Sequence, residues 1–363
     1  MVKEFEHLVP ILPQSLDRHS NIINCQNGLY DLKKGEFMGH DKELLITKIA
    51  NVPYNESFQK PTLWIKFLND IFGEDQELIR YVQKACGYCL SGSTQEQCAF
   101  FLIGSGRNGK STFLEIIRHI LGDYATNIQP ETIMVKPSST SGANSDIARL
   151  KGARLVTTVE PNEGARLNEG LLKQLTGDDI VTARKLYSEE FEFKPEFKLW
   201  MATNHKPVIR GTDTGIWRRI HLIPFTVQIP DSKVDKMLKY KLRKELPDIF
   251  RWMIEGYKLW SNEGLALPPV MAEAVKDYRH EMDVISSFID ACCAEGIERE
   301  VKAADLFNAY IRWASEHNEY RMSSTKFGTE MAKRFEKSKN RNNTIYKGID
   351  LLDSSNGYSI SIG

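Results

Sequence analysis

The chain has 363 residues, of which 41% are hydrophobic and 26% charged, and its formal net charge is zero. This composition is ordinary for globular domains, and the length favours two or three of them over a single core. A zero net charge excludes a globally positive field, so nucleic acid would have to be held by local basic patches. The sequence has no apolar run of membrane-spanning length and its first residues lack a signal-peptide core, so we expect a cytoplasmic protein with no membrane partner.

Residues 1–92 are predicted to form a mixed, partly helical region. Residues 24–36 indicate two short strands around a turn, and helices are expected over 62–69 and 76–90. Cys86 and Cys89 have the spacing of a redox or zinc motif, but the sequence offers no second ligand pair at suitable spacing. Buried structural thiols are therefore the favoured interpretation.

Residues 104–111 read G-S-G-R-N-G-K-S, which fits the phosphate-binding loop G-x-x-x-x-G-K-[ST]. An apolar run before it predicts a buried strand, and apolar residues at helical spacing after it predict a helix. Such a loop turns backbone N–H groups toward a triphosphate at the helix N-terminus. We expect the lysine to reach the β- and γ-phosphates and the serine to hold Mg²⁺. The residues expected to bind the nucleotide are Gly104, Gly106, Arg107, Asn108, Gly109, Lys110, Ser111 and Thr112.

Residues 93–230 are predicted to form the core around this loop. Strand-like runs end just before Glu160, just before Asn204 and at Ile223, and their alternation with helical or loop segments indicates an α/β fold with a parallel sheet. Glu160 can bind metal or act as a general base, or it is an exposed acid at a strand end. Asn204 can position water or touch the γ-phosphate, or it simply caps its strand.

Arg218 and Arg219 precede the last core strand. An arginine at this point can reach a neighbouring subunit's γ-phosphate as an arginine finger. A surface basic pair, or an arginine stacked on Trp217, is the alternative, and the residues alone barely separate these readings.

A polar, basic excursion lies between the Glu160 and Asn204 strands. A hairpin there would present Arg184 and Lys185 at its tip, with Tyr187 available for stacking, which suits a single-stranded backbone. A solvated charged loop is the alternative. Lys173 opens the sequence K-Q-L-T-G-D just before this excursion.

The remaining sequence predicts a helical segment over 231–282 and a third unit over 283–363. That unit reads as helices, including 304–316 and a basic helix 324–337, followed by strands near 344–351 and 358–361. Helices followed by a short hairpin indicate a winged-helix-like domain. Its basic residues favour DNA contact only slightly over a solvated helix face.

These motifs, in this order, resemble superfamily 3 helicases, specifically the helicase portion of phage and plasmid primases and of poxvirus primase-helicases. The resemblance covers nearly the whole chain, and Lys-x-x-Thr-Gly-Asp is its most specific motif. The segments that carry it are 27–32, 87–92, 106–112, 173–178, 183–184, 204–207, 217–219 and 223–225.

The resemblance implies an AAA+ P-loop core and a homo-oligomeric ring, expected to be a hexamer, that threads single-stranded DNA with ATP and Mg²⁺. Lys110 and Ser111 would match its Walker A residues and Glu160 its Walker B acid. Asn204 would match the sensor, and Arg218 or Arg219 the finger. Pro161 follows Glu160 where many relatives carry a second acid, so Glu160 would serve both metal and water.

The resemblance also implies that Arg184 and Lys185 match the channel hairpin that grips DNA. Lys173 and Tyr187 are further residues expected to contact DNA. The family's primase module is not recognisable in this sequence, so the chain is expected either to be the helicase part of a larger protein or to act with a separate primase or polymerase.

Three hypotheses follow from this sequence. The leading one is an ATP-dependent replicative DNA helicase of a phage or mobile element, located in the host cytoplasm. An ATP-switched DNA-binding initiator or loader without processive unwinding is the alternative. A small-molecule kinase is the weakest, because nothing resembles an acceptor pocket.

Overall fold

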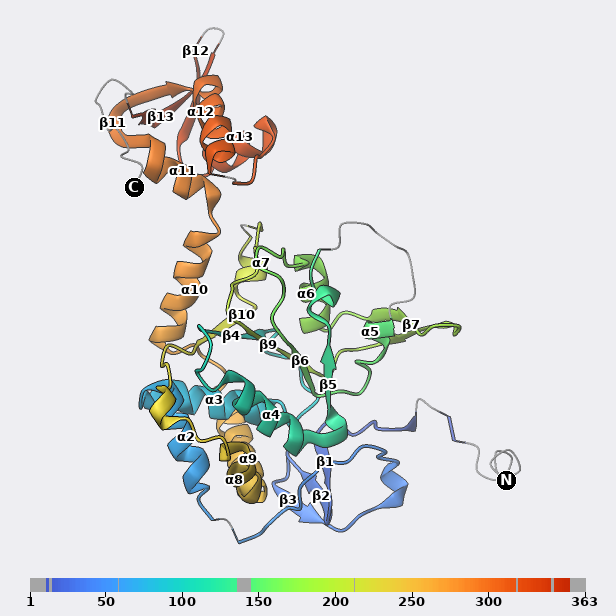
Figure 1. Cartoon of the computed structure of the whole chain (residues 1–363). Coiled ribbons are helices and arrows are strands. Elements are labelled where there is room, and N and C mark those ends of the chain that lie inside the picture. Colours follow the sequence, from blue (N-terminus) through green and yellow to red (C-terminus); the bar gives the residue numbers. More distant parts are fainter. Residues whose placement is uncertain are drawn as a thin grey trace. The chain divides into compact units, whose positions relative to one another are not determined.

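The structure is a computed structural model, and it describes residues 11–12, 15–57, 59–135, 145–211, 213–317, 319–340 and 343–352. The chain divides into two compact units, residues 1–276 and 277–363 (Figure 1). The finer division expected from the sequence, at 92, 230 and 282, stays a prediction. None of the helices in the described ranges combines the length and apolarity that a bilayer crossing requires.

A five-stranded parallel sheet forms the centre of the first unit (Figure 1). In spatial order its strands are β10 (Ile220–Pro224), β4 (Ala99–Ile103), β9 (Lys198–Thr203), β6 (Leu155–Thr158) and β5 (Ala125–Ile128). Four of these strands are short apolar runs that the sequence predicts, and the parallel sheet is confirmed. The sequence analysis missed β5, because it is short and its burial is mostly partial.

Helices and turns connect and cover these strands. The helices of the first unit, apart from the last, are α2 (Thr62–Phe72), α3 (Gln76–Tyr88), α4 (Lys110–Leu121), α5 (Ser145–Ala148), α6 (Glu169–Thr176), α7 (Thr214–Trp217), α8 (Leu238–Leu242) and α9 (Leu246–Glu263). The 3-10 turns are Lys42–Leu44, Gly122–Tyr124, Pro130–Thr132, Asp231–Lys233 and Arg243–Glu245.

Aromatic side chains fill the core between the sheet and these helices. Trp64 of α2 stacks on Phe113 of α4 with ring centroids 5.7 Å apart, and Phe113 contacts Trp200 of β9 at 5.8 Å. Helices α3 and α9 are in contact at Gly87 and Gly256. A Cβ on Gly87 would lie 2.0 Å from the Tyr257 nitrogen, and a Cβ on Gly256 would lie 2.1 Å from the Gln83 carbonyl oxygen, so no larger residue fits at either position. Aromatic burial and close helix packing therefore fix α2, α3 and α9 against the sheet.

Two smaller sheets complete the first unit. Strands β1 (Ile22–Cys25), β2 (Gly28–Asp31) and β3 (Glu36–Met38) form an antiparallel sheet, one strand more than predicted. Strands β7 (Val181–Arg184) and β8 (Glu190–Phe193) form the predicted hairpin. The cysteines of helix α3 and its cap, Cys86 and Cys89, are free and fully buried, as expected of structural thiols.

Two buried cations fasten the β1 region to the lower edge of the central sheet, where β6 and β9 begin. The Arg154 guanidinium donates to the Leu90 carbonyl at 2.5 Å and the Ile22 carbonyl at 2.6 Å. The Lys198 ammonium donates to the carbonyls of Ser91 and Ser93. A buried cation without hydrogen-bond partners is costly in free energy. These carbonyls therefore hold the start of β1 and residues 90–93 against the sheet.

In the second unit, three helices pack on an antiparallel sheet with the order β11-β13-β12. Its elements are α11 (Val284–Cys292), β11 (Cys293–Lys302), α12 (Ala303–Glu316), α13 (Ser324–Ala332), β12 (Glu336–Asn340) and β13 (Asn343–Leu351), and α10 (Pro269–Glu281) leads into it. Phe288, Tyr310 and Phe327 are at the centre of its core.

The structure corrects two expectations for this unit. The helix predicted over 324–337 ends at Ala332, because Glu336 already pairs with Lys347 in the β12–β13 ladder. Strand β11 was not predicted, since most of its side chains are exposed and its pattern is not apolar. The strand predicted over 358–361 lies outside the described residues.

Lys198 gives the first unit a testable pH dependence. Burial lowers the pKa of its ammonium to about 7, whereas the pKa is about 10.4 in an unfolded chain. Between these values the unfolded state binds the extra proton, so stability rises with pH and is lost as the pH falls toward 7. From pH 7 to 8.5 we expect the wild type to gain about 1–2 kcal/mol of unfolding free energy relative to Lys198→Met. Urea denaturation at both pH values measures this gain, and a constant difference would contradict it.

Candidate nucleotide and DNA site

The phosphate-binding loop lies between β4 and α4, as predicted. Gly109 precedes the helix with φ +88, a conformation that favours glycine, and no side chain caps the first N–H groups of α4. Asn108 is buried and donates to the Ser105 carbonyl at 2.6 Å, which holds the loop closed on itself. The uncapped N–H groups of this twelve-residue helix leave room for an anion at its N-terminus.

Three of the predicted catalytic residues meet beside this loop. The Lys110 ammonium donates to the Gly104 carbonyl and to Asn204 Oδ1 at 3.1 Å. Both oxygens of Glu160 accept from Asn204, from its backbone N–H at 3.0 Å and from its side-chain Nδ2 at 2.8 Å. Burial lowers the pKa of Lys110, and the nearby Glu160 carboxylate opposes that shift. Asn204 therefore links the lysine to the carboxylate.

The strand order explains why Lys110, Asn204 and Glu160 lie close together. Strand β9 lies between β4 and β6, and all three are parallel, so their carboxyl ends share one edge of the sheet. The loop follows β4, Glu160 follows β6 and Asn204 follows β9. Pro161, after Glu160, is buried, whereas the Glu160 side chain is exposed at this edge.

His205 is a residue of this site that the sequence analysis did not single out. Its Nε2 lies 3.9 Å from Glu160 Oε1, and its Nδ1 lies 4.0 Å from a Glu163 oxygen. Thr203 fixes the segment, because its hydroxyl donates to the His205 carbonyl at 2.7 Å. Its position directly after Asn204 in the chain is the signal that could have identified it.

A large cavity adjoins the loop. It has a volume of about 940 Å³ and is lined by Arg107, Gly109 and Thr112 of the loop region, by α2, and by residues 227–239. Phe67 and Ile229 give it an apolar part, which suits a ring system. This cavity was not predicted from the sequence, because α2 and the 227–239 segment are far apart in the chain.

The residues present fit a magnesium triphosphate. The loop offers the helix N-terminus, a buried lysine at its base and open space at Gly106, where an added Cβ would meet nothing within 4 Å. Ser111 and Glu160 are exposed on this side and supply the hydroxyl and carboxylate oxygens that Mg²⁺ prefers.

The two candidate finger arginines lie away from this site. They precede β10, whose first residue pairs with the first residue of β4, so they lie at the opposite sheet edge from the loop after β4. Arg218 is exposed and donates to Gln97 Oε1 at 2.8 Å. Arg219 is partly buried and donates to the Gly215 carbonyl at 2.7 Å. Neither belongs to this chain's own nucleotide site.

The hairpin presents its predicted tip to solvent. Arg184 ends β7 opposite Glu190, Lys185 follows in the turn, and the Tyr187 side chain is 101% exposed with φ +59. The structure does not bring Lys173 to this tip. Its ammonium pairs with Asp213 at 2.8 Å, and this contact lowers the pKa of the Asp213 carboxyl.

The arrangement of sheet, loop and site is that of an α/β protein compatible with a P-loop NTPase. Residues 1–73 match the family described as "D5 N terminal like" and residues 280–354 the family described as "Poxvirus D5 protein-like". Residues 102–219 match a family of unknown function, DUF5906. Over residues 1–73 and 280–354 the chain is therefore similar to families described for the poxvirus D5 protein.

Similar proteins come from large DNA viruses. A candidate helicase, L207/L206 of Acanthamoeba polyphaga mimivirus, is 29% identical over 84% of this chain and 34% of its own length. A candidate helicase, 022R of Frog virus 3, is 27% identical over 70% of this chain and 28% of its own length. Primase D5 of Fowlpox virus is 26% identical over 60% of this chain and 29% of its own length. The chain thus spans about a third of these relatives, or less.

A solved structure with a similar fold is the apo C-terminal region of NrS-1. The TM-score is 0.53 at 12% identity, and the similarity covers 82% of this chain and 77% of that one. At this identity the likeness concerns the fold alone.

Two glycines of the loop should respond differently to alanine. A Cβ on Gly104 would lie 2.2 Å from the Phe225 carbonyl oxygen and 2.5 Å from Asn108 Nδ2, so Gly104→Ala must displace β10 or the loop. We expect it to lower the unfolding free energy by about 1–3 kcal/mol. Gly106→Ala is the matched control, because that Cβ meets open space. Chemical denaturation measures both variants, and equal losses would contradict this packing of the loop.

Proposed function

We propose that this chain is the ATP-dependent helicase portion of a viral or mobile-element replication protein, built on an AAA+ core. The observation that carries the proposal is the contact of Lys110 with Asn204 and of Asn204 with Glu160 beside an uncapped helix N-terminus. The inserted strand β9, which puts an amide between the P-loop lysine and the acid, supports the AAA+ assignment. The names of the relatives support a replication role.

Each residue of the proposed site has a distinct part. The N–H groups of the loop and the Lys110 ammonium bind the β- and γ-phosphates of ATP, with the base in the adjoining cavity. Ser111 and Glu160 would hold Mg²⁺, which would neutralise phosphate charge when bound. Asn204 donates to both Glu160 oxygens and so orients this carboxylate toward the γ-phosphate side. Glu160 then accepts a proton from the attacking water as general base.

The position of the arginines supports a site shared between subunits. Because Arg218 and Arg219 lie at the far sheet edge, they can act only on a neighbouring copy's nucleotide, which favours a homo-oligomeric ring, proposed as a hexamer. Arg218 is the better finger. It is exposed, whereas Arg219 donates to Gly215 and its Nε is buried. The Arg218 guanidinium donates to Gln97 Oε1.

The exposed hairpin supports a grip on single-stranded DNA. Arg184 and Lys185 supply charge for the backbone and Tyr187 a ring for stacking. Three acids on the same hairpin, Glu189, Glu190 and Glu192, limit this attraction, so stacking carries much of the proposed grip.

The second unit supports a DNA-contacting role of a winged-helix type. Helix α13 is followed directly by the β12–β13 ribbon, and Lys337 and Lys339 lie on that ribbon. At the C-terminal end of α13, Lys333 after the helix pairs with Glu330 at 2.7 Å, which compensates its charge. This compact unit is the observation that favours the second candidate, an ATP-switched initiator or loader. A primase or polymerase, on the same or another chain, is the proposed working partner.

Variants of the two central residues test the ATPase proposal. Lys110→Ala should abolish triphosphate binding, because it removes the ammonium that lies beside Gly104. Glu160→Gln should keep binding but slow hydrolysis at least about 100-fold, since the amide cannot accept the proton. Phosphate release with and without single-stranded DNA, beside nucleotide titrations, measures both. Hydrolysis that ignores DNA, or that survives in both variants, would contradict the proposal.

A variant of the hairpin distinguishes the helicase proposal from the ATP-switched initiator. Arg184→Ala with Lys185→Ala should leave ATP binding intact, abolish unwinding and weaken binding of single-stranded DNA. Loss of two phosphate contacts should also reduce the slope of log K against log salt by about 1.4. Lys42→Ala with Lys60→Ala, two exposed lysines elsewhere, is the control. Unchanged unwinding in the hairpin variant would refute its role and favour the initiator.

A further inference from the structure

A second cavity lies far from the phosphate-binding loop. Its volume is about 580 Å³, within the range of roughly 300–1,000 Å³ that small-ligand sites have. Three segments meet there: residues around β1 and β2, the 91–97 loop before β4, and the last turns of α9. The 91–97 loop precedes β4 and the phosphate-binding loop follows it, so the two sites are separated by about 16 Å of strand.

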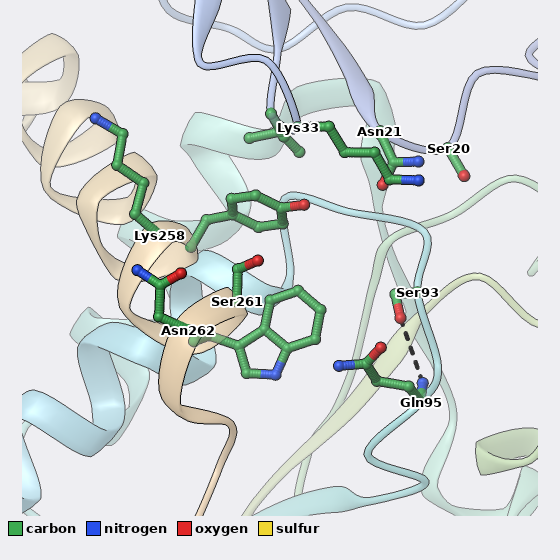
Figure 2. Close-up of a pocket in the computed structure, with 11 residues that line it drawn as sticks. Ser20, Asn21, Lys33, Ser93, Gln95, Lys258, Ser261 and Asn262 are labelled. Carbon is green, nitrogen blue, oxygen red and sulfur yellow. Dashed lines mark hydrogen bonds between the residues drawn. The ribbon is translucent and has the colours of Figure 1, made fainter.

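Three side-chain amides surround this cavity from separate elements. Figure 2 shows Asn21 beside the β1–β2 region, Gln95 on the loop and Asn262 on α9. None of these amides makes a side-chain hydrogen bond to another described residue, although each can both donate and accept. Paired donors and acceptors of this kind match the hydrogen-bonding edge of a nucleobase.

The floor of the cavity is aromatic and its rim is cationic. Tyr257 and Trp260 form the floor, with ring centroids 5.4 Å apart, and the Trp260 indole donates to Glu96 at 2.7 Å, which fixes its plane. Lys33 and Lys258 are at the rim. Glu255 holds the Lys258 ammonium at 2.9 Å, whereas Lys33 has no ion pair among the described residues. The described lining contains no Asp or Glu, and the neighbouring Glu96 and Glu255 each accept a hydrogen bond from a lining side chain.

We propose that this cavity binds one nucleotide unit, with the base edge held by Asn21, Gln95 and Asn262 and the phosphate by Lys33. The cavity has no glycine loop or helix N-terminus to take a triphosphate, so a monophosphate is the matching charge. The unit comes either from a free nucleoside monophosphate or from a nucleotide of a single strand. Both present the same base and phosphate. The inference is independent of the ATPase proposal.

The binding test uses full-length chain carrying Lys110→Ala, so that the phosphate-binding loop does not contribute. Equilibrium dialysis with radiolabelled deoxynucleoside 5′-monophosphates measures the free-nucleotide arm. A fluorescent pentathymidylate measures the strand arm, in protein that also carries Arg184→Ala and Lys185→Ala to remove the proposed hairpin contact. Gln95→Ala with Asn262→Ala removes two exposed amides, and Asn308→Ala, an exposed helical amide of the second unit, is the matched control.

We expect saturable binding of at least one probe, weakened at least tenfold by the double amide variant and less than twofold by Asn308→Ala. Lys33→Glu should weaken the same binding more at low than at high salt. If the double amide variant loses binding of the monophosphates, the site is assigned to free nucleotides. If that variant loses binding of the pentathymidylate alone, the site is assigned to a strand. Absence of saturable binding below about 1 mM, or binding indifferent to the amide variants, overturns the proposal. Failure of ATP binding in the wild type would count against the ATPase proposal alone.

Discussion

The parallel insertion of β9 between β4 and β6 is the constraint on which the candidate site depends. Parallel strands end at one edge, so this order puts the loop lysine, an amide and a carboxylate side by side. Lys110, Asn204 and Glu160 are then joined by hydrogen bonds among themselves. In the proposed mechanism, this preorganisation orients the carboxylate without further rearrangement. A slip of β9 in its register would separate all three groups.

The opposite edge of the sheet has its own organising element, the 91–97 loop. The carbonyls of Ser91 and Ser93 bind the buried Lys198, and the Thr94 hydroxyl donates to Asp178 at 2.8 Å, at the base of the hairpin. Gln97 accepts from Arg218. A single short loop thus contacts the hairpin base, the exposed arginine and the proposed nucleotide-unit cavity. Through these hydrogen bonds it links the surfaces that we propose for DNA and for a neighbouring subunit.

Motifs with strict spacing could be predicted from the sequence, whereas pairings across long chain distances could not. The phosphate-binding loop, the strands before Glu160 and Asn204, and the hairpin each depend on local pattern, and the structure has all of them. The cavity beside the loop joins α2 to residues 227–239, and no local pattern encodes that contact. The pairing of Lys173 with Asp213 was missed for the same reason, since forty residues separate the two.

Some misses came from the local pattern itself. Strand β5 is only partly buried, and β11 is mostly exposed, so neither shows the apolar run that marks a core strand. The helix predicted to continue to Lys337 stops earlier because ladder pairing with β13 outweighs helix propensity there. In these three segments, pairing with a neighbouring strand determines the secondary structure, and local propensity does not.

The central claim is that one subunit's loop and another's arginine make one ATP site, and a mixing experiment tests it most directly. Lys110→Ala protein keeps its arginine, and Arg218→Ala protein keeps its loop, so each alone should lack DNA-stimulated ATPase activity. Mixed in equal amounts, they should regain a substantial fraction of it, because intact loops then face intact arginines. Activity that stays absent in stable mixed assemblies, or an Arg218→Ala protein that hydrolyses ATP as well as the wild type, would contradict the account.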